Sequence, residues 1–179
     1  MRRVLYMMGI LDDFDMEWLI THGNVVQVKK DTVLIREGGE VDCVYILLDG
    51  RLSVVRSGID GEIARLTAGE ILGEISFVDS RAPSASVIAL QDAQVLSISR
   101  EVLKEKLAKD VAFAARFYHA IGAFLADRLR ATVSQLGYGR ATENAAADDL
   151  DDRWIEDVSF AATRFDQLLR RLGIVQPAA

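Results

Sequence analysis

The residues best suited to binding chemistry lie in the segment GEISFVDSRAPSASV, residues 73–87. It opens with Gly73 and Glu74 and closes with small residues, a composition typical of a loop that places backbone N–H groups around an anion. A positive charge is expected beside such an anion, yet that position carries Pro83. Proline offers neither a charged side chain nor a backbone N–H group. The segment is therefore either a working ligand loop or one that has lost its ligand.

Other reactive residue types give no second site. Cys43 is the only cysteine, which excludes an intramolecular disulfide and a cysteine-based zinc cluster, and its apolar surroundings predict a buried small side chain. His22 and His119 fall in different predicted helices, each without an acid or hydroxyl partner pattern. Nucleophile elbows, Walker loops and zinc motifs are absent from the sequence. We therefore predict a protein that is not an enzyme and holds no metal.

Composition indicates a globular chain of 179 residues, of which half are hydrophobic and 27% are charged. The formal net charge of −6 argues against a broadly basic nucleic-acid surface, although a local basic patch stays open. The N-terminal apolar run is short, is followed at once by acidic residues and has no cleavage site of small residues. Because no apolar stretch approaches membrane-spanning length, we predict a cytoplasmic protein without a membrane contact.

The elements that must position the loop begin with a short helix and continue as strands. Residues 12–22 predict a helix that ends at Gly23 and carries Phe14, Trp18 and Leu19 on one face. From residue 24 to residue 99, short apolar or alternating runs are separated by glycines, which predicts a compact β-barrel or sandwich. The Asp-Gly pairs at 49–50 and 60–61 each predict a hairpin turn.

A long helix is predicted from about residue 110 to residue 136. Its apolar residues recur at alternating steps of three and four, over roughly seven turns. A helix this long extends beyond a small barrel, so a second copy of the chain is the simplest cover for its apolar stripe. The alternative is that the stripe lies on the chain's own barrel. The predicted dimer seam consists of Val111, Ala114, Tyr118, Ile121 and Leu125, preceded by Leu103 and Leu107 and followed by Leu129, Val133 and Leu136.

The C-terminal part departs from this pattern. Residues 137–157 are rich in alanine and aspartate and predict a flexible acidic linker. Residues 158–175 predict an amphipathic helix, which is too short to be stable alone and must dock on its own protomer, on its twin or on another protein. We favour another protein, because a mobile acidic tether suits intermolecular docking. The expected anchors are Phe165, Leu168 and Leu172.

Three runs of sequence carry a family resemblance: TVLIREGGEVDCVYILLDGRLSVV, EIARLTAGEILGEISF and SASVIALQDAQVLSISREVLKEKL. In this order they resemble the cyclic-nucleotide-binding domain of the bacterial catabolite-activator and protein-kinase-regulatory-subunit family, over about residues 10–136. The resemblance implies a mainly β fold with flanking helices: an eight-stranded jelly-roll-like barrel, a short N-terminal helix and a long C-terminal helix that often dimerises. The expected domain therefore spans residues 1–136.

The resemblance also assigns roles within a phosphate-binding cassette. A glycine lets the backbone approach the sugar, a glutamate accepts a hydrogen bond from the ribose 2′-hydroxyl, and a short helix and small residues aim N–H groups at the phosphate. An arginine adds a charge-assisted contact to the phosphate, and a terminal hydroxyl, here of Ser84 or Ser86, reaches the nucleotide. The ligand residues implied are Gly73, Glu74, Ile75, Ser76, Arg81, Pro83, Ser84, Ala85 and Ser86.

One position departs from the family pattern. Many bacterial members read DGRPRSATV where this chain reads DSRAPSASV, so Arg81 matches the outer arginine and Pro83 replaces the phosphate-binding one. Such a loss typically costs about 2–5 kcal/mol, enough to bring a micromolar site toward millimolar. Arg81 either swings inward as a substitute or stays in solvent. Glu74 either binds a ribose or has a structural role, accepting local N–H groups or pairing with Arg81.

These expectations lead to a functional hypothesis. Family members that read DNA add a winged helix-turn-helix, for which residues 138–179 leave no room, so we expect no DNA binding by this chain. We predict a non-catalytic homodimeric sensor or adaptor that binds cAMP or cGMP weakly and signals through its long helix and its tail. The alternative is a ligand-independent protein-interaction module with a vestigial pocket.

Overall fold

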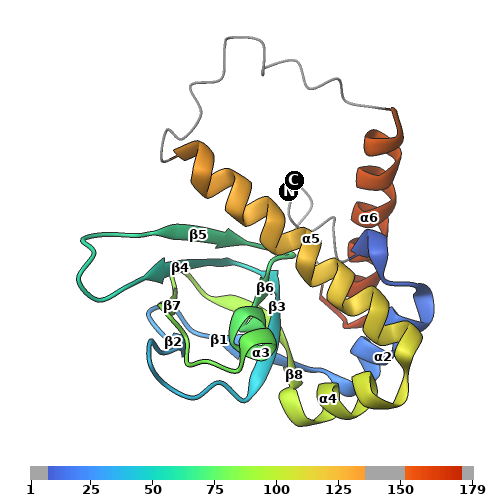
Figure 1. The fold of residues 1–179 in the computed structure, drawn as a ribbon, viewed down its shortest axis with the longest axis horizontal. Helices are drawn as coiled ribbons and strands as arrows, with labels where there is room; N and C mark the ends of the chain where they lie inside the picture. Colours follow the sequence, from blue (N-terminus) through green and yellow to red (C-terminus); the bar gives the residue numbers. More distant parts are fainter. Residues whose placement is uncertain (1–7, 136–151, 175–179) are drawn as a thin grey trace.

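The computed structural model describes residues 8–135 and 152–174. Eight strands form two antiparallel four-stranded sheets, ordered β1-β8-β3-β6 and β2-β7-β4-β5 (Figure 1). The strands are β1 (Asn24–Val28), β2 (Val33–Ile35), β3 (Cys43–Asp49), β4 (Arg51–Val55), β5 (Ala64–Thr67), β6 (Ile71–Leu72), β7 (Ser86–Ala89) and β8 (Ala93–Ser99).

The sheets do not close into the barrel that we expected. Each sheet ends in an edge strand on both sides, and within the described residues the two sheets share no strand. The edge strand β6 is only two residues long, which is too short to carry pairing onward to the other sheet. The fold is therefore a two-sheet structure of antiparallel strands with flanking helices.

Strand β3 separates the two parts of the core because both of its faces are buried. Val44, Ile46 and Leu48 belong to a cluster that contains the helices. Leu47 belongs to a second cluster, which lies between the sheets and includes Leu52 of β4. A strand buried on both faces reads as a continuous apolar run, as the sequence VYILL does.

The hairpin turns predicted at the two Asp-Gly pairs differ in outcome: one is confirmed and one is not. Gly61 (φ +87°) lies in the connection between β4 and β5, which pair with each other, so the hairpin predicted there is confirmed. Gly50 (φ +98°) links β3 to β4, which belong to different sheets, so the pair at 49–50 makes a turn but no hairpin. A side chain at Gly50 would collide with Ala93, since a Cβ there would lie 2.6 Å from the Ala93 Cβ.

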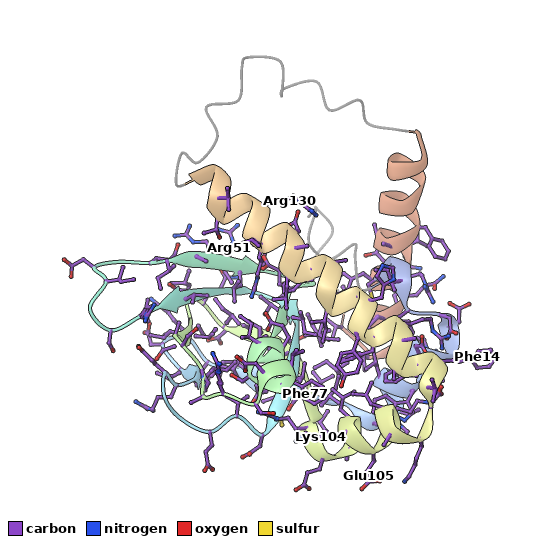
Figure 2. The ribbon with its side chains drawn as sticks, in the orientation of Figure 1. Phe14, Arg51, Phe77, Lys104, Glu105 and Arg130 are labelled. Atoms are coloured by element: carbon purple, nitrogen blue, oxygen red, sulfur yellow. The ribbon has the colours of Figure 1, made fainter. Side chains whose placement is uncertain are left out.

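The helices are α2 (Asp13–His22), α3 (Glu74–Asp79), α4 (Arg100–Lys109), α5 (Val111–Gln135) and α6 (Asp152–Arg171). A capping box in which Asp12 and Asp15 exchange side-chain hydrogen bonds starts α2. The predicted apolar face of this helix was partly wrong. Phe14 is 86% exposed and projects away from the fold (Figure 2), whereas Leu19 is fully buried.

The long helix begins at Val111, close to the predicted start, and does not continue the helix before it. Asp110 has an extended backbone that ends α4, and its Oδ1 accepts a 2.9 Å hydrogen bond from the Phe113 N–H in the first turn of α5. Leu103 and Leu107 therefore belong to α4 and not to the predicted seam. One aspartate thus caps both helices.

The face that α5 buries is not centred on the predicted seam. Phe113, Phe117, Ala120 and Phe124 are buried in the helical cluster, together with the seam residue Ile121. Ala114 and Leu125 pack at its flank, whereas Val111 is 80% exposed and Tyr118 is 49% exposed. The aromatic stripe is the buried face because its side chains remove more apolar area from water than the valine and alanine of the seam. Leu129 and Val133 are exposed as well, and Leu136 lies outside the described residues.

The C-terminal helix α6 docks on its own protomer, one of the three possibilities that the sequence left open. Phe165 and Leu168 are buried in the same cluster as Leu19 and Phe113, and Leu172 packs against that cluster. Figure 1 shows α6 (red) beside α2. The groove that we expected on another protein is therefore on this chain.

Arg164 fastens α6 to the N-terminal segment. Its guanidinium donates to the backbone carbonyls of Met8 and Leu11 and to Asp13 Oδ1, the last at 2.6 Å. The helix begins at Asp152, inside the segment predicted to be linker. Residues 137–151 of that segment lie outside the described part of the chain. None of the described helices combines the length and apolarity needed to cross a bilayer.

Candidate functional site

The predicted ligand loop starts at a position that only glycine can occupy easily. Gly73 has φ +79°, and a Cβ built on it would lie 2.9 Å from the Cys43 carbonyl oxygen of β3. This left-handed residue turns the chain from β6 into α3, so that Glu74 becomes the first residue of a short helix. The carboxylate of Glu74 is thereby directed inward and is only 2% exposed.

The partner of Glu74 comes from the long helix and not from the loop. Arg128 of α5 donates a hydrogen bond from its Nη1 to Glu74 Oε1 at 2.7 Å. Its Nη2 lies 3.5 Å from Oε2 of Glu70, a second buried carboxylate. The same guanidinium lies over the Phe124 ring, 4.4 Å from its centroid. The structural partner of Glu74 is therefore Arg128 and not Arg81, the partner that the sequence suggested.

Burial changes the pKa of this carboxyl group. Desolvation raises the pKa of Glu74 above its ordinary value of 4.5, and the nearby Glu70 acts in the same direction. Arg128 and the N–H groups at the start of α3 oppose the shift but do not cancel it. The carboxyl group is therefore held by Arg128 while retaining a raised affinity for a proton.

A cavity of about 290 Å³ opens beside Glu74. Its lining contains Glu74, residues of the loop and Arg128. It also contains apolar residues from strands of both sheets, namely Ile35, Val54, Leu66, Leu72 and Val87. The predicted loop thus borders a cavity whose lining combines a carboxylate and a guanidinium with apolar side chains.

The second half of the loop is fixed by contacts with the segment that follows β2. The Pro83 carbonyl accepts a 2.9 Å hydrogen bond from the Gly38 N–H. The Ser86 hydroxyl accepts a 2.9 Å hydrogen bond from the Glu37 N–H, and Ser86 is not among the residues that line the cavity. Of the two serines considered for ligand contact, Ser84 is the one at the cavity.

The remaining predicted ligand residues lie at different places around the cavity. Ile75, Ser76 and Ala85 line the cavity, with Ile75 46% exposed and Ser76 buried. Arg81 also lines it but is exposed, and its backbone N–H donates to Asp79 Oδ1 at 2.9 Å. The structure therefore places Arg81 at the rim.

Sequence reasoning missed two arginines that hold the site. Arg128 follows Phe117 and Phe124 on the buried face of α5, so the aromatic stripe would have predicted its direction. Arg100 donates to the backbone oxygens of Val41 and Ser76, both at 2.9 Å, and so ties α3 to the start of α4. Its position directly after β8 gave no comparable signal.

The fold and this loop define a ligand-binding domain, and comparison with known proteins identifies its family. Residues 25–110 match the family model described as the cyclic nucleotide-binding domain. The resemblance inferred from the sequence is therefore confirmed.

Curated relatives match over a single domain. The lysophospholipase nte1 of Neurospora crassa is 32% identical over 91 residues, which cover 49% of this chain and 6% of that protein. The cAMP-dependent protein kinase regulatory subunit of Aspergillus niger is 25% identical over 84 residues, which cover 47% of this chain and 20% of that protein. The chain thus spans a small part of the length of these relatives.

Solved structures show the same fold. A cyclic nucleotide-binding domain from Methylobacillus flagellatus superposes with a TM-score of 0.69 at 21% identity, over 79% of this chain and 85% of that one. The Thermus thermophilus catabolite activator protein gives a TM-score of 0.58 at 18% identity, over 94% of this chain and 88% of that one. At these identities the likeness concerns the fold alone.

Proposed function

We propose that this chain is a non-catalytic, cytoplasmic sensor that uses the cavity beside Glu74 to bind a cyclic-nucleotide-like ligand and reports occupancy through α5. The observation that carries this proposal is the hydrogen bond between Arg128 and Glu74. A ligand hydroxyl that hydrogen-bonds to Glu74 competes with Arg128 for the same carboxylate. Binding is therefore coupled to the position of the long helix.

A second contact supports the coupling between the loop and α5. Phe77 of α3 is buried, and its ring meets the ring of Phe117 of α5 edge to face, with the centroids 6.0 Å apart. A shift of α3 on ligand binding must therefore be followed by α5 or leave a void in the core. Exposed apolar side chains on α5, at Val111, Tyr118 and Leu129, offer a surface through which a homodimer responds to that movement.

The test combines binding with a readout on α5. Purified protein is titrated calorimetrically with cAMP and with cGMP, and amide hydrogen exchange is measured with and without each ligand. We expect weak binding and a change in exchange over residues 121–135. Arg128→Gln should retain saturable binding but lose the change in exchange. Binding without any change in α5 would contradict the coupling.

Two observations favour a second candidate function. Pro83 occupies the position that the family resemblance gives to the phosphate-binding arginine, and Arg128 already satisfies Glu74 in this structure. Both fit a protein-interaction module in which the pocket is vestigial and the ion pair is purely structural. Absence of binding at millimolar cAMP, cGMP and nucleoside, together with retained association with a partner, would favour this function.

A further inference from the structure

The charges around the cavity do not suit an anionic ligand. Within the described residues, its lining contains the carboxylates Glu74 and Asp79 and the guanidinium groups of Arg81 and Arg128. Arg128 is bonded to Glu74 and lies near Glu70, so its charge is already balanced by two carboxylates. Arg81 is at the exposed rim, where solvent screens its charge. The inner end of the cavity thus carries no surplus positive charge.

The loop also offers a phosphate fewer hydrogen-bond donors and less charge than its sequence suggests. Pro83 has no N–H group, and its carbonyl is bonded to Gly38, which fixes the peptide at this point. The Ser86 hydroxyl is engaged by the Glu37 N–H. Among the described residues that line the cavity, a phosphodiester placed here would find only the exposed Arg81 as a charged partner not already paired. Burying a poorly paired charge is strongly unfavourable.

What the cavity retains is suited to the uncharged part of a nucleotide. Glu74 is a hydrogen-bond acceptor, for which a sugar hydroxyl competes with Arg128. The apolar residues of the lining suit the face of a heteroaromatic base. The volume of about 290 Å³ is at the small end of ligand cavities. An acceptor for a hydroxyl together with apolar side chains is what a ribose with an attached base requires.

We infer that this cavity selects an uncharged ribonucleoside over the corresponding cyclic nucleotide. The inference rests on the proposed function, since it names the ligand class of the same site. The missing phosphate contact removes the usual advantage of the cyclic nucleotide, and the desolvation of its charge becomes a penalty. We expect adenosine or guanosine to bind about tenfold or more tightly than cAMP or cGMP.

The experiment is a calorimetric titration of the unmodified full chain with adenosine, guanosine, cAMP, cGMP and 2′-deoxyadenosine. The deoxynucleoside is the matched control, because it lacks the hydroxyl that donates to Glu74 and leaves the protein unchanged. It should bind about 10- to 100-fold more weakly than adenosine. A nucleoside that binds at least tenfold more tightly than its cyclic monophosphate supports the inference.

The other outcomes separate this inference from the proposed function. A cyclic nucleotide that binds as tightly as its nucleoside, or more tightly, overturns the inference and leaves the sensor intact. Equal affinity for adenosine and 2′-deoxyadenosine overturns the role of Glu74 as the hydroxyl acceptor, and with it the inference. No binding of any probe at millimolar concentration overturns both the inference and the sensor.

Discussion

Arg128 of α5 and Glu74 of α3 are joined by a 2.7 Å hydrogen bond across 54 positions of sequence. The bond links the first side chain of the ligand loop to the long helix, and both groups are largely buried, with Glu74 2% and Arg128 25% exposed. An ion pair shielded from water in this way is strongly coupled to the groups around it. A change at either residue should therefore be felt at the other, in stability as well as in ligand binding.

Arg128 and Glu74 should stabilise the folded chain only when both are present. Arg128→Gln leaves a buried carboxylate without its guanidinium, which should lower the free energy of unfolding by about 2–3 kcal/mol. Adding Glu74→Gln should restore most of this loss, as measured by urea unfolding of the two single variants and the double variant. Arg130→Gln is the control, because Arg130 lies on the same helix and is exposed (Figure 2). Additive losses in the double variant would show that the two residues are not coupled.

The stability conferred by Glu74 should fall as the pH rises. Burial raises the pKa of Glu74 above 4.5, so the folded chain binds this proton more tightly than the unfolded chain does. Its contribution is fully present below pH 4.5 and is lost as the pH rises through the folded pKa. The free energy of unfolding of the wild type, relative to Glu74→Gln, should therefore decrease from pH 4.5 toward neutrality.

Urea unfolding of both proteins over a series of pH values measures this difference. Glu101→Gln is the matched control substitution, since Glu101 is exposed at the start of α4. If the wild type instead gains stability relative to Glu74→Gln as the pH rises, the pairing with Arg128 outweighs desolvation and the pKa of Glu74 is lowered.

Pro83→Arg should restore affinity for a cyclic phosphate. A guanidinium at this position supplies the charge-assisted contact that the loop lacks, so cAMP should bind about 10- to 100-fold more tightly, with little change for adenosine. Pro83→Ala is the matched control, because it restores the backbone N–H group without the charge. Glu74→Ala should weaken binding of either ligand. Calorimetry that finds cAMP affinity unchanged in Pro83→Arg would place any nucleotide outside this loop.

Several features of this site follow from the sequence, and others do not. Gly73, Glu74 and the small residues that follow are adjacent in the chain, so their grouping was predictable from local pattern and resemblance. The partner Arg128 was not, because its contact depends on which face α5 turns toward the sheets. The predicted seam is displaced from the buried stripe by one residue, Tyr118 in place of Phe117, which is a rotation of about 100° on a helix. Ranking the stripes by aromatic content would have corrected it.

The fold shows the same division between local and long-range information. The short N-terminal helix, the glycine-punctuated strands and the start of α5 were predictable from periodicity and capping residues. The predicted seam wrongly included Leu103 and Leu107, on the other side of the break at Asp110, because the apolar spacing runs from Leu107 to Val111 without interruption. The docking of α6 was predicted on another protein, and this was wrong because a helix with one apolar face does not specify which groove covers it.

A homodimer through α5 should depend on its exposed face. Leu129→Asp, at a position that is 65% exposed, should give a monomer by sedimentation while leaving the thermal unfolding midpoint nearly unchanged. Ile121 is unsuitable for this test, because it is 3% exposed and a charge there would disrupt the chain's own core. Phe14→Asp on α2 serves as the control for removing an exposed apolar side chain elsewhere. A Leu129→Asp protein that remains dimeric would place the interface away from this face.

The tail should stabilise the domain to which it is attached. Removing residues 140–179 uncovers the apolar groove occupied by α6 and should lower the thermal unfolding midpoint. Phe165→Ala should reduce the free energy of unfolding by about 3–5 kcal/mol, because Phe165 is buried in the helical cluster. Asp166→Ala, at the adjacent exposed position, should have little effect. A truncated chain with an unchanged midpoint would mean that α6 contributes nothing to the fold.

Because Asp110 caps two helices, α4 and α5 meet at this residue, and a tilt of α5 about it displaces the distant part of the helix. Arg128 lies 18 residues beyond this joint, which at about 1.5 Å per residue is an arm of about 27 Å. A tilt of about 2° about Asp110 would move Arg128 by about 1 Å, which is enough to stretch its hydrogen bond to Glu74 beyond about 3.5 Å. We therefore expect the ion pair to weaken when α5 tilts about Asp110, because the distance between Arg128 and Glu74 depends on the orientation of the helix.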